Sequence, residues 1–300
     1  MIGEIAALSA ACLWALASLI YARLGQGRSG LALNLGKGVI ALALLAITLV
    51  SKGLIMPPIT AQTGSLLLIS GALGIGLGDS LYLEALRSLG ARRTLLLGTL
   101  APGMSSGLAL LFLQETLSGR AGWGMAITLI GIVWVISERV PLLEQEGDQR
   151  VSVSGKGISL AIWAAVAQAI GAVLSRAALA NTPVSPEWAA FLRLMAGVTV
   201  LLVWGAIHAQ LQDWWRSLMA KTLLIQLSVA AFAGTYLGIW LQQVSLKYTV
   251  TGISQTLNAT SPLFALVLTV LGGKAVTARA WGGALIAVAG VALLVGGLQS

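Results

Sequence analysis

Apolar segments long enough to cross a lipid bilayer recur along the whole chain, and this feature limits its fold more than any other. The hydrocarbon core of a bilayer is about 30 Å thick, so a helix rising 1.5 Å per residue needs about 20 residues to cross it. An apolar segment inside lipid must satisfy its backbone hydrogen bonds internally, and a helix does so on its own. We therefore predict an all-α, polytopic membrane protein with ten transmembrane helices.

The predicted spans form two sets of five, separated by one extended polar segment. They cover residues 3–22, 31–50, 64–86, 94–113 and 120–138 in the first set, and 157–179, 186–208, 222–243, 251–271 and 279–298 in the second. Charged and small polar residues between the two sets are typical of a linker. The predicted organisation is a first five-helix repeat at 1–138, a polar linker at 139–156 and a second five-helix repeat at 157–300.

The low charge content excludes a soluble, nucleic-acid-binding interpretation of this basic chain. Its net charge is +8 at pH 7, but only 9% of its residues are charged, and its 18 Lys and Arg residues are scattered between apolar segments. Soluble proteins carry about 25% charged residues. We therefore expect the cations to face membrane surfaces, with the lipid bilayer as a partner and no nucleic-acid partner.

The sequence contains no motif for ATP hydrolysis or for metal catalysis. It has no P-loop or HExxH motif, one histidine, His208, and one cysteine, Cys12. ATP-driven pumping and metal catalysis are therefore unsupported. We predict no cofactor, no metal site and no enzymatic activity.

The two halves resemble each other at positions that helix formation alone does not require, which indicates an internal repeat. The equivalent features are Leu100-Ala101-Pro102 and Thr260-Ser261-Pro262, Gly78 and Gly238, and Lys37 and Arg193. Because each half has an odd number of spans, the second half must enter the membrane in the opposite direction to the first. The expected architecture is an inverted repeat, as in many transporters.

An ordered set of short motifs carries a resemblance to a known family. The set comprises Trp14 in the first span, a basic residue early in the second, Ala85-Leu86, Pro102, Leu113-Gln114-Glu115, and Gly124 followed by Leu129-Ile130-Gly131. In this order and spacing, the chain resembles the EamA-type branch of the drug/metabolite transporter superfamily over nearly its whole length. The resemblance implies export or exchange of small organic metabolites such as amino acids.

The second half departs from the family pattern in two places. Gly273-Lys274 stands where the family usually has Gly-Glu, and Gln168 stands where the first half has Trp14. These departures predict that the two halves are not strictly equivalent.

Few ionisable residues lie inside the predicted spans, where each costs about 2.5 to 3.5 kcal/mol. Lys37 and Asp79 lie at matching depth on the second and third spans, so we predict that they form an ion pair. Under the functional hypothesis, a substrate ammonium or a proton at Asp79 releases Lys37. The alternative is a static bridge between two helices. Trp14 and Tyr82 are predicted to belong to the same substrate site.

Arg193 lies within the seventh span, and the eighth span offers no acidic residue at matching depth. Its charge is then available to an anionic group of a ligand. Under the alternative interpretation, Arg193 binds carbonyl groups at a helix end or extends toward lipid headgroups, helped by Glu187.

Two polar stripes in the second half are candidate cavity walls. Tyr236, Trp240 and Gln243 share one face of the eighth span by i, i+4, i+7 spacing, and Gln255 and Asn258 lie on a polar stripe of the ninth. We predict that Tyr236, Trp240, Gln255 and Asn258 line one central cavity. The alternative is that these groups serve as hydrogen bonds between packed helices.

Pro102 and Pro262 occupy corresponding places in the two repeats and are predicted to kink the fourth and ninth spans. Each proline removes one intrahelical hydrogen bond and frees a backbone carbonyl. In transporters built from inverted repeats, interrupted helices of this kind mark the binding region near the midplane. A kink that serves packing alone is the alternative.

These observations favour a secondary transporter of small organic metabolites that works by alternating access, coupled to protons or to counter-substrate, in the cell (inner or plasma) membrane. An intramembrane enzyme acting on a lipid or isoprenoid would need clustered carboxylates or histidines, and the acids here are dispersed. A structural membrane subunit has no need of charges in mid-span. Substrate, coupling ion and oligomeric state are not predicted.

The orientation of the chain is predicted differently by charge and by the resemblance. Twelve cations fall on the side that the first span reaches, and four fall on the other: Arg23, Arg28, Arg87, Arg92, Arg93, Arg139, Arg150, Lys156, Arg216, Lys221, Lys274 and Arg279 against Lys52, Arg120, Arg176 and Lys247. The positive-inside rule then places both termini outside the cytoplasm, whereas the family resemblance implies termini inside. Both predict that the termini share one side.

Overall fold

The computed structural model describes residues 1–25, 28–89, 91–138, 155–273 and 275–296. Within these ranges every regular element is a helix, and ten segments are long and apolar enough to cross a membrane. The all-α, ten-helix fold is therefore confirmed. Of the predicted linker, only residues 155 and 156 are described, and Lys274 also lies outside the described ranges.

Helices of the first half build five spans. Their elements are α1 (Ile2–Leu24), α2 (Gly30–Ser51), α3 (Ala61–Gly71) with η1 (Ala72–Gly78) and α4 (Asp79–Leu89), α5 (Ala91–Gly98) with α6 (Leu100–Leu113), and α7 (Gly119–Ser137). Polar caps begin some of them: the hydroxyls of Thr60 and Ser118 accept hydrogen bonds from backbone N–H groups in the first turns of α3 and α7.

Helices of the second half repeat this order. Their elements are α8 (Gly155–Leu179), α9 (Pro186–Ile207), α11 (Lys221–Ala230) with η3 (Ala231–Leu237) and α12 (Gly238–Tyr248), α13 (Thr251–Asn258) with α14 (Ser261–Leu271), and α15 (Ala278–Gly296). One further helix, α10 (Leu211–Leu218), lies between the seventh and eighth spans. It buries Trp214 against α2 and α9 and exposes Trp215, as an amphipathic helix at an interface does.

The third and eighth spans each contain a π-helical stretch at equivalent positions. The stretch η1 reads ALGIGLG and η3 reads AFAGTYL, and both are continuous with α-helix on either side. In a π-helix the backbone hydrogen bonds run from residue i to i+5, so the faces on either side are out of α-helical register. This irregularity turns the following residues to a face that α-helical spacing does not predict.

The fourth and ninth spans are interrupted just before their prolines. The fourth breaks between α5 and α6 at Thr99, and the ninth breaks between α13 and α14 at residues 259–260. A proline disfavours helical geometry at the preceding residue and lacks the N–H that would bond four residues back. Pro262 accordingly occupies the first turn of α14, where no donor is needed.

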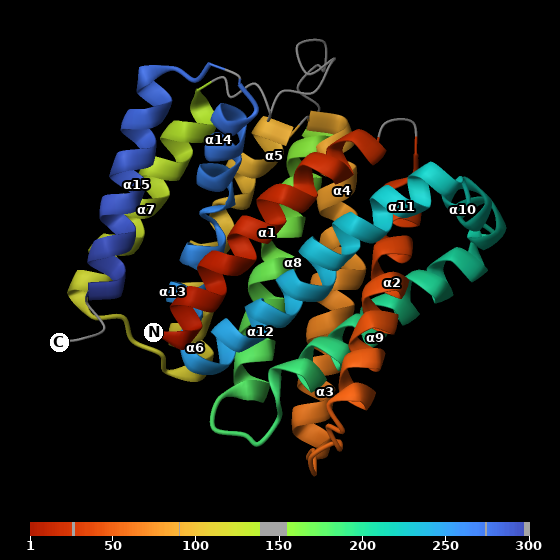
Figure 1. Cartoon of the computed structure of the whole chain (residues 1–300). Helices are drawn as coiled ribbons and strands as arrows, with labels where there is room; N and C mark the ends of the chain where they lie inside the picture. The colour runs from red at the N-terminus through yellow and green to blue at the C-terminus, as the bar shows by residue number, and fades with distance from the viewer. Residues whose placement is uncertain (26–27, 90, 139–154, 274, 297–300) are drawn as a thin grey trace.

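The two halves are interlocked around the centre of the molecule (Figure 1). Helix α1 of the first half packs against η3 and α12 of the second, while α8 of the second half packs against η1 and α4 of the first. Likewise α2 packs against η3, and α9 packs against η1. The elements that surround the centre therefore come alternately from the two repeats.

Helices α7 and α15 form a peripheral pair with close backbone contact (Figure 1). Gly124 faces Leu294, and Gly131 faces Ala287, where an added Cβ would lie 2.4 Å from a backbone nitrogen in each case. Because the residue number rises on one helix as it falls on the other, these equivalent helices run antiparallel. Such opposite directions are what an odd number of spans in each repeat requires.

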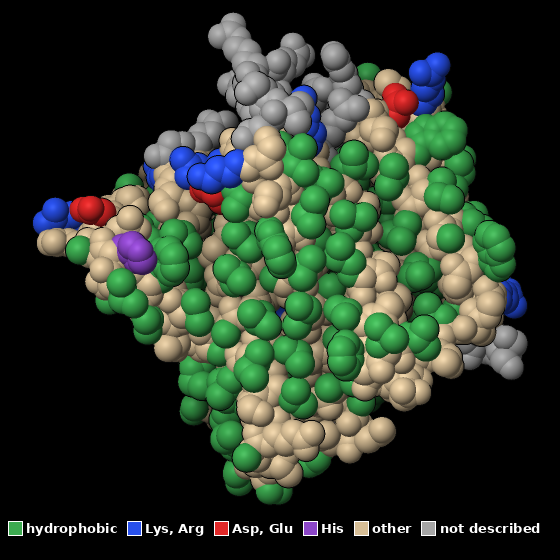
Figure 2. All heavy atoms as spheres, turned by 180° about the vertical axis from the view of Figure 1, so that it is seen from behind, with side chains coloured by type: hydrophobic (Ala, Val, Ile, Leu, Met, Phe, Trp, Pro, Cys, Tyr) green, Lys and Arg blue, Asp and Glu red, His purple; other side chains and the backbone are tan. Residues whose placement is uncertain are grey.

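The spans end at two opposite ends of the bundle. We call the end where α1 and α4 finish and α8 begins the linker side, and the end where α1 begins and α15 finishes the terminal side (Figure 1). Apolar side chains are spread over the whole face seen in Figure 2, and most of its Lys and Arg lie toward the upper, linker-side end. Large apolar residues such as Phe112 and Trp123 are more than 70% exposed, as expected of a surface that faces lipid.

Candidate functional site

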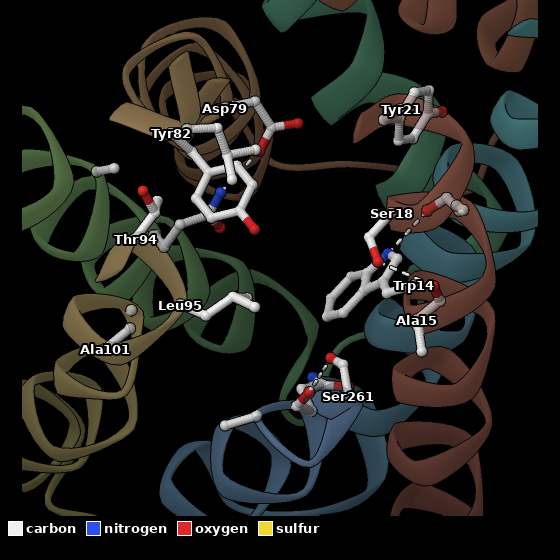
Figure 3. Close-up of a pocket in the computed structure, with 18 of the residues that line it drawn as sticks. Trp14, Ala15, Ser18, Tyr21, Asp79, Tyr82, Thr94, Leu95, Ala101 and Ser261 are labelled. Carbon is white, nitrogen blue, oxygen red and sulfur yellow. Dashed lines mark hydrogen bonds between the residues drawn. The ribbon is translucent and has the colours of Figure 1, made fainter. Parts of the chain in front are cut away.

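A cavity of about 330 Å³ lies between the two repeats. Every span except the tenth contributes to its wall. In Figure 3, side chains of Trp14 on α1, Tyr82 on α4, Leu95 on α5 and Ser261 on α14 point toward the same central space. The cavity is thus built by the interrupted and π-helical spans of both repeats, near the lower limit of the 300 to 1,000 Å³ common for small-molecule sites.

Charged residues of the first repeat form a partly buried pair on the cavity wall. Lys37 Nζ lies 2.5 Å from Asp79 Oδ2, and the two side chains are 12% and 21% exposed. Gln168 Nε2 donates to the other carboxylate oxygen, Asp79 Oδ1, at 2.8 Å. The ion pair that the sequence predicts is therefore present, and its carboxylate is also bound by the second repeat.

Each π-helical stretch has a backbone carbonyl bonded by the other repeat. Trp14 Nε1 donates to the Gly234 carbonyl in η3 at 2.7 Å, and Gln168 Nε2 donates to the Gly74 carbonyl in η1 at 3.2 Å. The wide π turn leaves free carbonyls that would accept backbone hydrogen bonds in an α-helix. The side chains of Trp14 and Gln168 donate to these carbonyls instead. Trp14 and Gln168 thus occupy equivalent places and both donate to a carbonyl of the other repeat, one through an indole N–H and the other through an amide N–H.

Arg193 enters the cavity wall from α9 and is 2% exposed. Its Nη1 lies 3.4 Å from Gln242 Oε1 on α12, a long hydrogen bond, and its Nε has no partner among the described residues. Glu187, which the alternative interpretation assigned to it, pairs instead with Lys52 at 3.3 Å. Arg193 therefore does not extend to the lipid surface, and that alternative is wrong.

Gln255 and Asn258 line the same cavity from α13. Both are more than 90% buried, yet Gln255 Nε2 and both amide atoms of Asn258 make no hydrogen bond within the described part of the chain. A buried polar group left without a partner costs about 1 to 3 kcal/mol. Groups kept at that cost on a cavity wall are candidates for ligand contact.

The prediction for the eighth span is wrong in part, because Tyr236 and Trp240 do not line this cavity. They stack on each other at 6.4 Å between ring centroids and pack among α2 and α9 residues, with Tyr236 Oη 2.7 Å from Thr48 Oγ1. The neighbouring stripe, with Thr235 and Gln242, faces the cavity instead.

Gln243 also lies away from the cavity. It is fully buried, and its Oε1 accepts a hydrogen bond from the Ser175 hydroxyl on α8. It joins the eighth span to the sixth in the way that polar residues join packed helices in membranes. The alternative role as a packing hydrogen bond therefore holds for Gln243.

The cavity approaches the linker side more closely than the terminal side. Leu86 and Thr94 on its wall lie within one helical turn of Leu89 and Ala91, where α4 ends and α5 begins. Toward the terminal side, Gln255 is the wall residue that comes nearest to a helix end, and a separate ionic cluster lies beyond it at the ends of the neighbouring spans.

That terminal-side cluster centres on an ion pair that the sequence does not predict. Arg176 Nε on α8 lies 2.6 Å from Glu115 Oε1, and Glu115 Oε2 accepts from the Thr251 N–H at 2.8 Å. Arg176 Nη1 also donates to the carbonyls of Leu246 and Lys247. The cluster thereby ties the fourth, sixth, eighth and ninth spans together at one end.

Of the predicted site residues, those brought together on the cavity wall are Trp14, Lys37, Asp79, Tyr82, Pro102, Arg193, Gln255, Asn258 and Pro262. The sequence did not predict Gln168 as a partner of Asp79. The available signal was that Gln168 occupies the position in the second repeat that is equivalent to Trp14 in the first. The sequence also did not predict Thr235 and Gln242, which α-helical spacing cannot distinguish from their neighbours. Among the described residues, no group of three or more His, Cys, Asp or Glu is placed to hold a metal ion.

Comparisons with known proteins give one family and one fold. The sequence model of the EamA-like transporter family matches residues 1–137 and 155–296. A solved structure titled only as a crystal structure of a protein superposes with a TM-score of 0.73 over 97% of this chain and 96% of that one. At 17% identity this similarity shows the fold alone. No curated protein matches the chain significantly.

Proposed function

The chain belongs to the EamA-like transporter family, and on that premise we propose that it is a secondary transporter of small organic metabolites, such as amino acids or related compounds. The family makes it a multi-pass membrane transporter of the drug/metabolite transporter superfamily. We propose that it works by alternating access as an exporter or exchanger in the cell membrane, coupled to protons or to counter-substrate.

The observation that carries this proposal is the placement of the cavity between two interlocked repeats. The cavity approaches the linker side, while the Glu115–Arg176 cluster joins four spans on the terminal side. Rocking of one repeat against the other would break that cluster and close the linker-side approach, which is the motion that inverted-repeat transporters use. The geometry therefore supports one access state of a two-state carrier.

The ion pair inside the cavity supports coupling. Asp79 binds Lys37 from its own repeat and Gln168 from the other, so its charge state bears on both halves. A proton or a ligand ammonium at Asp79 would weaken its attraction to Lys37 and change which packing of the repeats is favoured. Flux measured on Asp79→Asn decides between this response and a static bridge.

Flux through proteoliposomes tests the proposal. Purified protein is reconstituted, and efflux and exchange of radiolabelled amino acids, organic acids, amines and nucleosides are measured with and without a pH gradient. We expect saturable flux of at least one class above the rate of protein-free liposomes. Absence of flux for every class, in vesicles where inserted and folded protein is demonstrated, would contradict the proposal.

A further inference from the structure

Arg193 is held in a place built for a guanidinium. Its helix, α9, approaches the third span so closely at Gly71 that an added Cβ there would lie 2.1 Å from the Arg193 carbonyl oxygen. One turn on, an added Cβ at Gly74 would lie 3.1 Å from Arg193 Nη2. Gly71 thus admits the backbone of α9, and Gly74 leaves the room that the guanidinium occupies.

Among the described residues Arg193 forms no salt bridge, and Asp79, whose charge acts on it at longer range, is paired with Lys37. The ionisable Lys, Arg, Asp and Glu side chains that line the cavity in the described part of the chain are Lys37, Asp79 and Arg193. Lys37 and Asp79 form a pair, so the wall carries one net positive charge. A buried cation at low dielectric strongly favours an anionic partner.

Two amide groups suited to the same partner lie on α13, which lines the same cavity. Gln255 Nε2 and Asn258 Nδ2 are N–H donors on the cavity wall that make no hydrogen bond among the described residues. Gln242 Oε1 holds Arg193 Nη1 only at 3.4 Å, which leaves the guanidinium fork available. A planar guanidinium combined with amide N–H donors is an arrangement that proteins use for carboxylates.

Resting on the proposed transport function, we propose that Arg193, Gln255 and Asn258 form the subsite for a carboxylate group of the transported solute. The rest of the solute lies between Trp14 and Tyr82, whose side chains point into the same space (Figure 3). A cavity of about 330 Å³ limits that solute to a small carboxylate, comparable in size to an amino acid or an aromatic acid.

Matched pairs of compounds test the subsite without identifying the natural substrate. The probes are benzoate and benzamide, phenylacetate and phenylacetamide, and L-leucine and L-leucinamide, with binding to the full-length protein in nanodiscs measured by calorimetry. Each pair has similar shape and differs in the carboxylate. We expect at least one carboxylate to bind at least about tenfold more tightly than its amide, because only the carboxylate completes the ion pair.

Two substitutions at Arg193 and one outside the cavity test whether Arg193 causes the preference for carboxylates over amides. Arg193→Gln should reduce the preference for the carboxylate to within about twofold, and Arg193→Lys should retain part of it, because the charge remains without the planar fork. Arg279→Gln removes an exposed arginine of α15 and should leave the preference unchanged. The fold of each variant is checked by a symmetric size-exclusion peak and its unfolding temperature.

A fourth variant separates a ligand role from a packing role. Asn258→Leu replaces two amide atoms that make no hydrogen bond in the described protein with two methyl groups in the same branched arrangement. We expect the unfolding temperature to hold or rise while affinity for the carboxylate falls about three- to tenfold. A fall in unfolding temperature with unchanged affinity would contradict the role in the subsite.

The outcomes distinguish failure of this subsite from failure of the transport function. Equal affinity for carboxylates and amides, no binding of any carboxylate probe, or a preference that survives Arg193→Gln would each overturn the carboxylate subsite. If proteoliposomes nevertheless transport amines or nucleosides, the proposed transport function stands without this subsite. If they transport nothing, the transport function itself fails.

Discussion

Lys37 and Arg193 occupy equivalent places in the two repeats, and their surroundings differ. Lys37 lies 2.5 Å from the Asp79 carboxylate. At the position equivalent to Asp79, the second repeat has Ile239, which packs with apolar residues of α9 beside Arg193. The scaffold therefore repeats while the charge does not: one cation is neutralised within its own half, and the other faces the cavity.

The same pattern holds where the two repeats bind each other. Trp14 and Gln168 each bond a glycine carbonyl of a π-helical stretch, yet only Gln168 also reaches an ionised group. Backbone irregularities are thus shared by the repeats, whereas the side chains that contact them have diverged. A symmetric framework can rock about one centre, and asymmetric side chains let that centre recognise an asymmetric solute.

Replacing Asp79, the acid of the first repeat, should have the largest effect on transport. In Asp79→Asn the paired cation Lys37 loses its carboxylate, and Gln168 loses an ionic acceptor. We expect correct insertion and folding, with flux reduced by about 100-fold or its pH dependence abolished, equivalent to about 2.7 kcal/mol of transition-state stabilisation. Proteoliposome flux across a range of pH measures this.

Glu84→Gln is the matched control for that variant. It removes a carboxylate from the same helix, where Glu84 pairs with Arg87 in an exposed position outside the cavity. Its flux and pH profile should match those of the unsubstituted protein. If Asp79→Asn also leaves both unchanged, the pair is a static bridge between helices.

An acid introduced at position 239 of the second repeat should make the charges of the two halves alike. In Ile239→Asp the new carboxylate would stand beside Arg193 as Asp79 stands beside Lys37, so the cavity wall would lose its net positive charge. We expect affinity for carboxylate probes to fall at least about tenfold. Calorimetry on this variant and on Ile239→Asn, which adds a polar group without charge, isolates the electrostatic part. Equal effects of the two would show that Arg193 does not act through its charge.

The two cross-repeat hydrogen bonds should differ in importance. Gln168→Leu removes a bond to an ionised carboxylate and one to a carbonyl, whereas Trp14→Phe removes a single bond to a carbonyl. Bonds to charged groups are worth about 1.5 to 3 kcal/mol and neutral bonds about 0.5 to 1.5 kcal/mol. We expect flux to fall about tenfold in the first variant and about threefold in the second. The reverse order would mean that the aromatic wall matters more than the charge cluster.

The smallest effect on flux is expected from a substitution on the face of the eighth span that turns away from the cavity. Tyr236→Phe removes one hydroxyl, which bonds Thr48, and keeps the ring that stacks on Trp240. Stability should fall by about 1 kcal/mol, while flux and affinity stay within about twofold of the unsubstituted protein. Thermal unfolding and flux measured on the same preparation check both, and a selective loss of affinity would return Tyr236 to the binding site.

Much of the fold could be predicted from the sequence because lipid imposes one rule on every span. Apolar length fixes ten helices, and motif equivalence fixes two repeats. The Lys37–Asp79 pair was predictable for the same reason: helices of known rise place both groups at matching depth. Because burying either charge alone costs free energy, two opposite charges at the same depth are expected to pair.

What the sequence could not predict depends on rotation of helices and on contacts between the repeats. Tyr236 and Thr235 lie on adjacent stripes of the eighth span, and spacing alone cannot say which stripe faces inward when a π-helical stretch interrupts the helix. The bond from Gln168 to Asp79 joins the two repeats, so the equivalence of Gln168 and Trp14 indicates the position but not the partner. The Glu115–Arg176 pair likewise joins segments far apart in the chain.

Cysteine labelling inside the cavity tests the central claim that the space between the repeats holds the solute. In a Cys12→Ser background, Ser261→Cys places one thiol on the wall (Figure 3), and Ser65→Cys places one on the exposed surface of α3. A membrane-impermeant thiol reagent is applied to each variant with and without a saturating transported solute. The account predicts that the solute slows labelling at position 261 at least about tenfold and leaves position 65 unchanged. Equal labelling rates at position 261 with and without solute would contradict it.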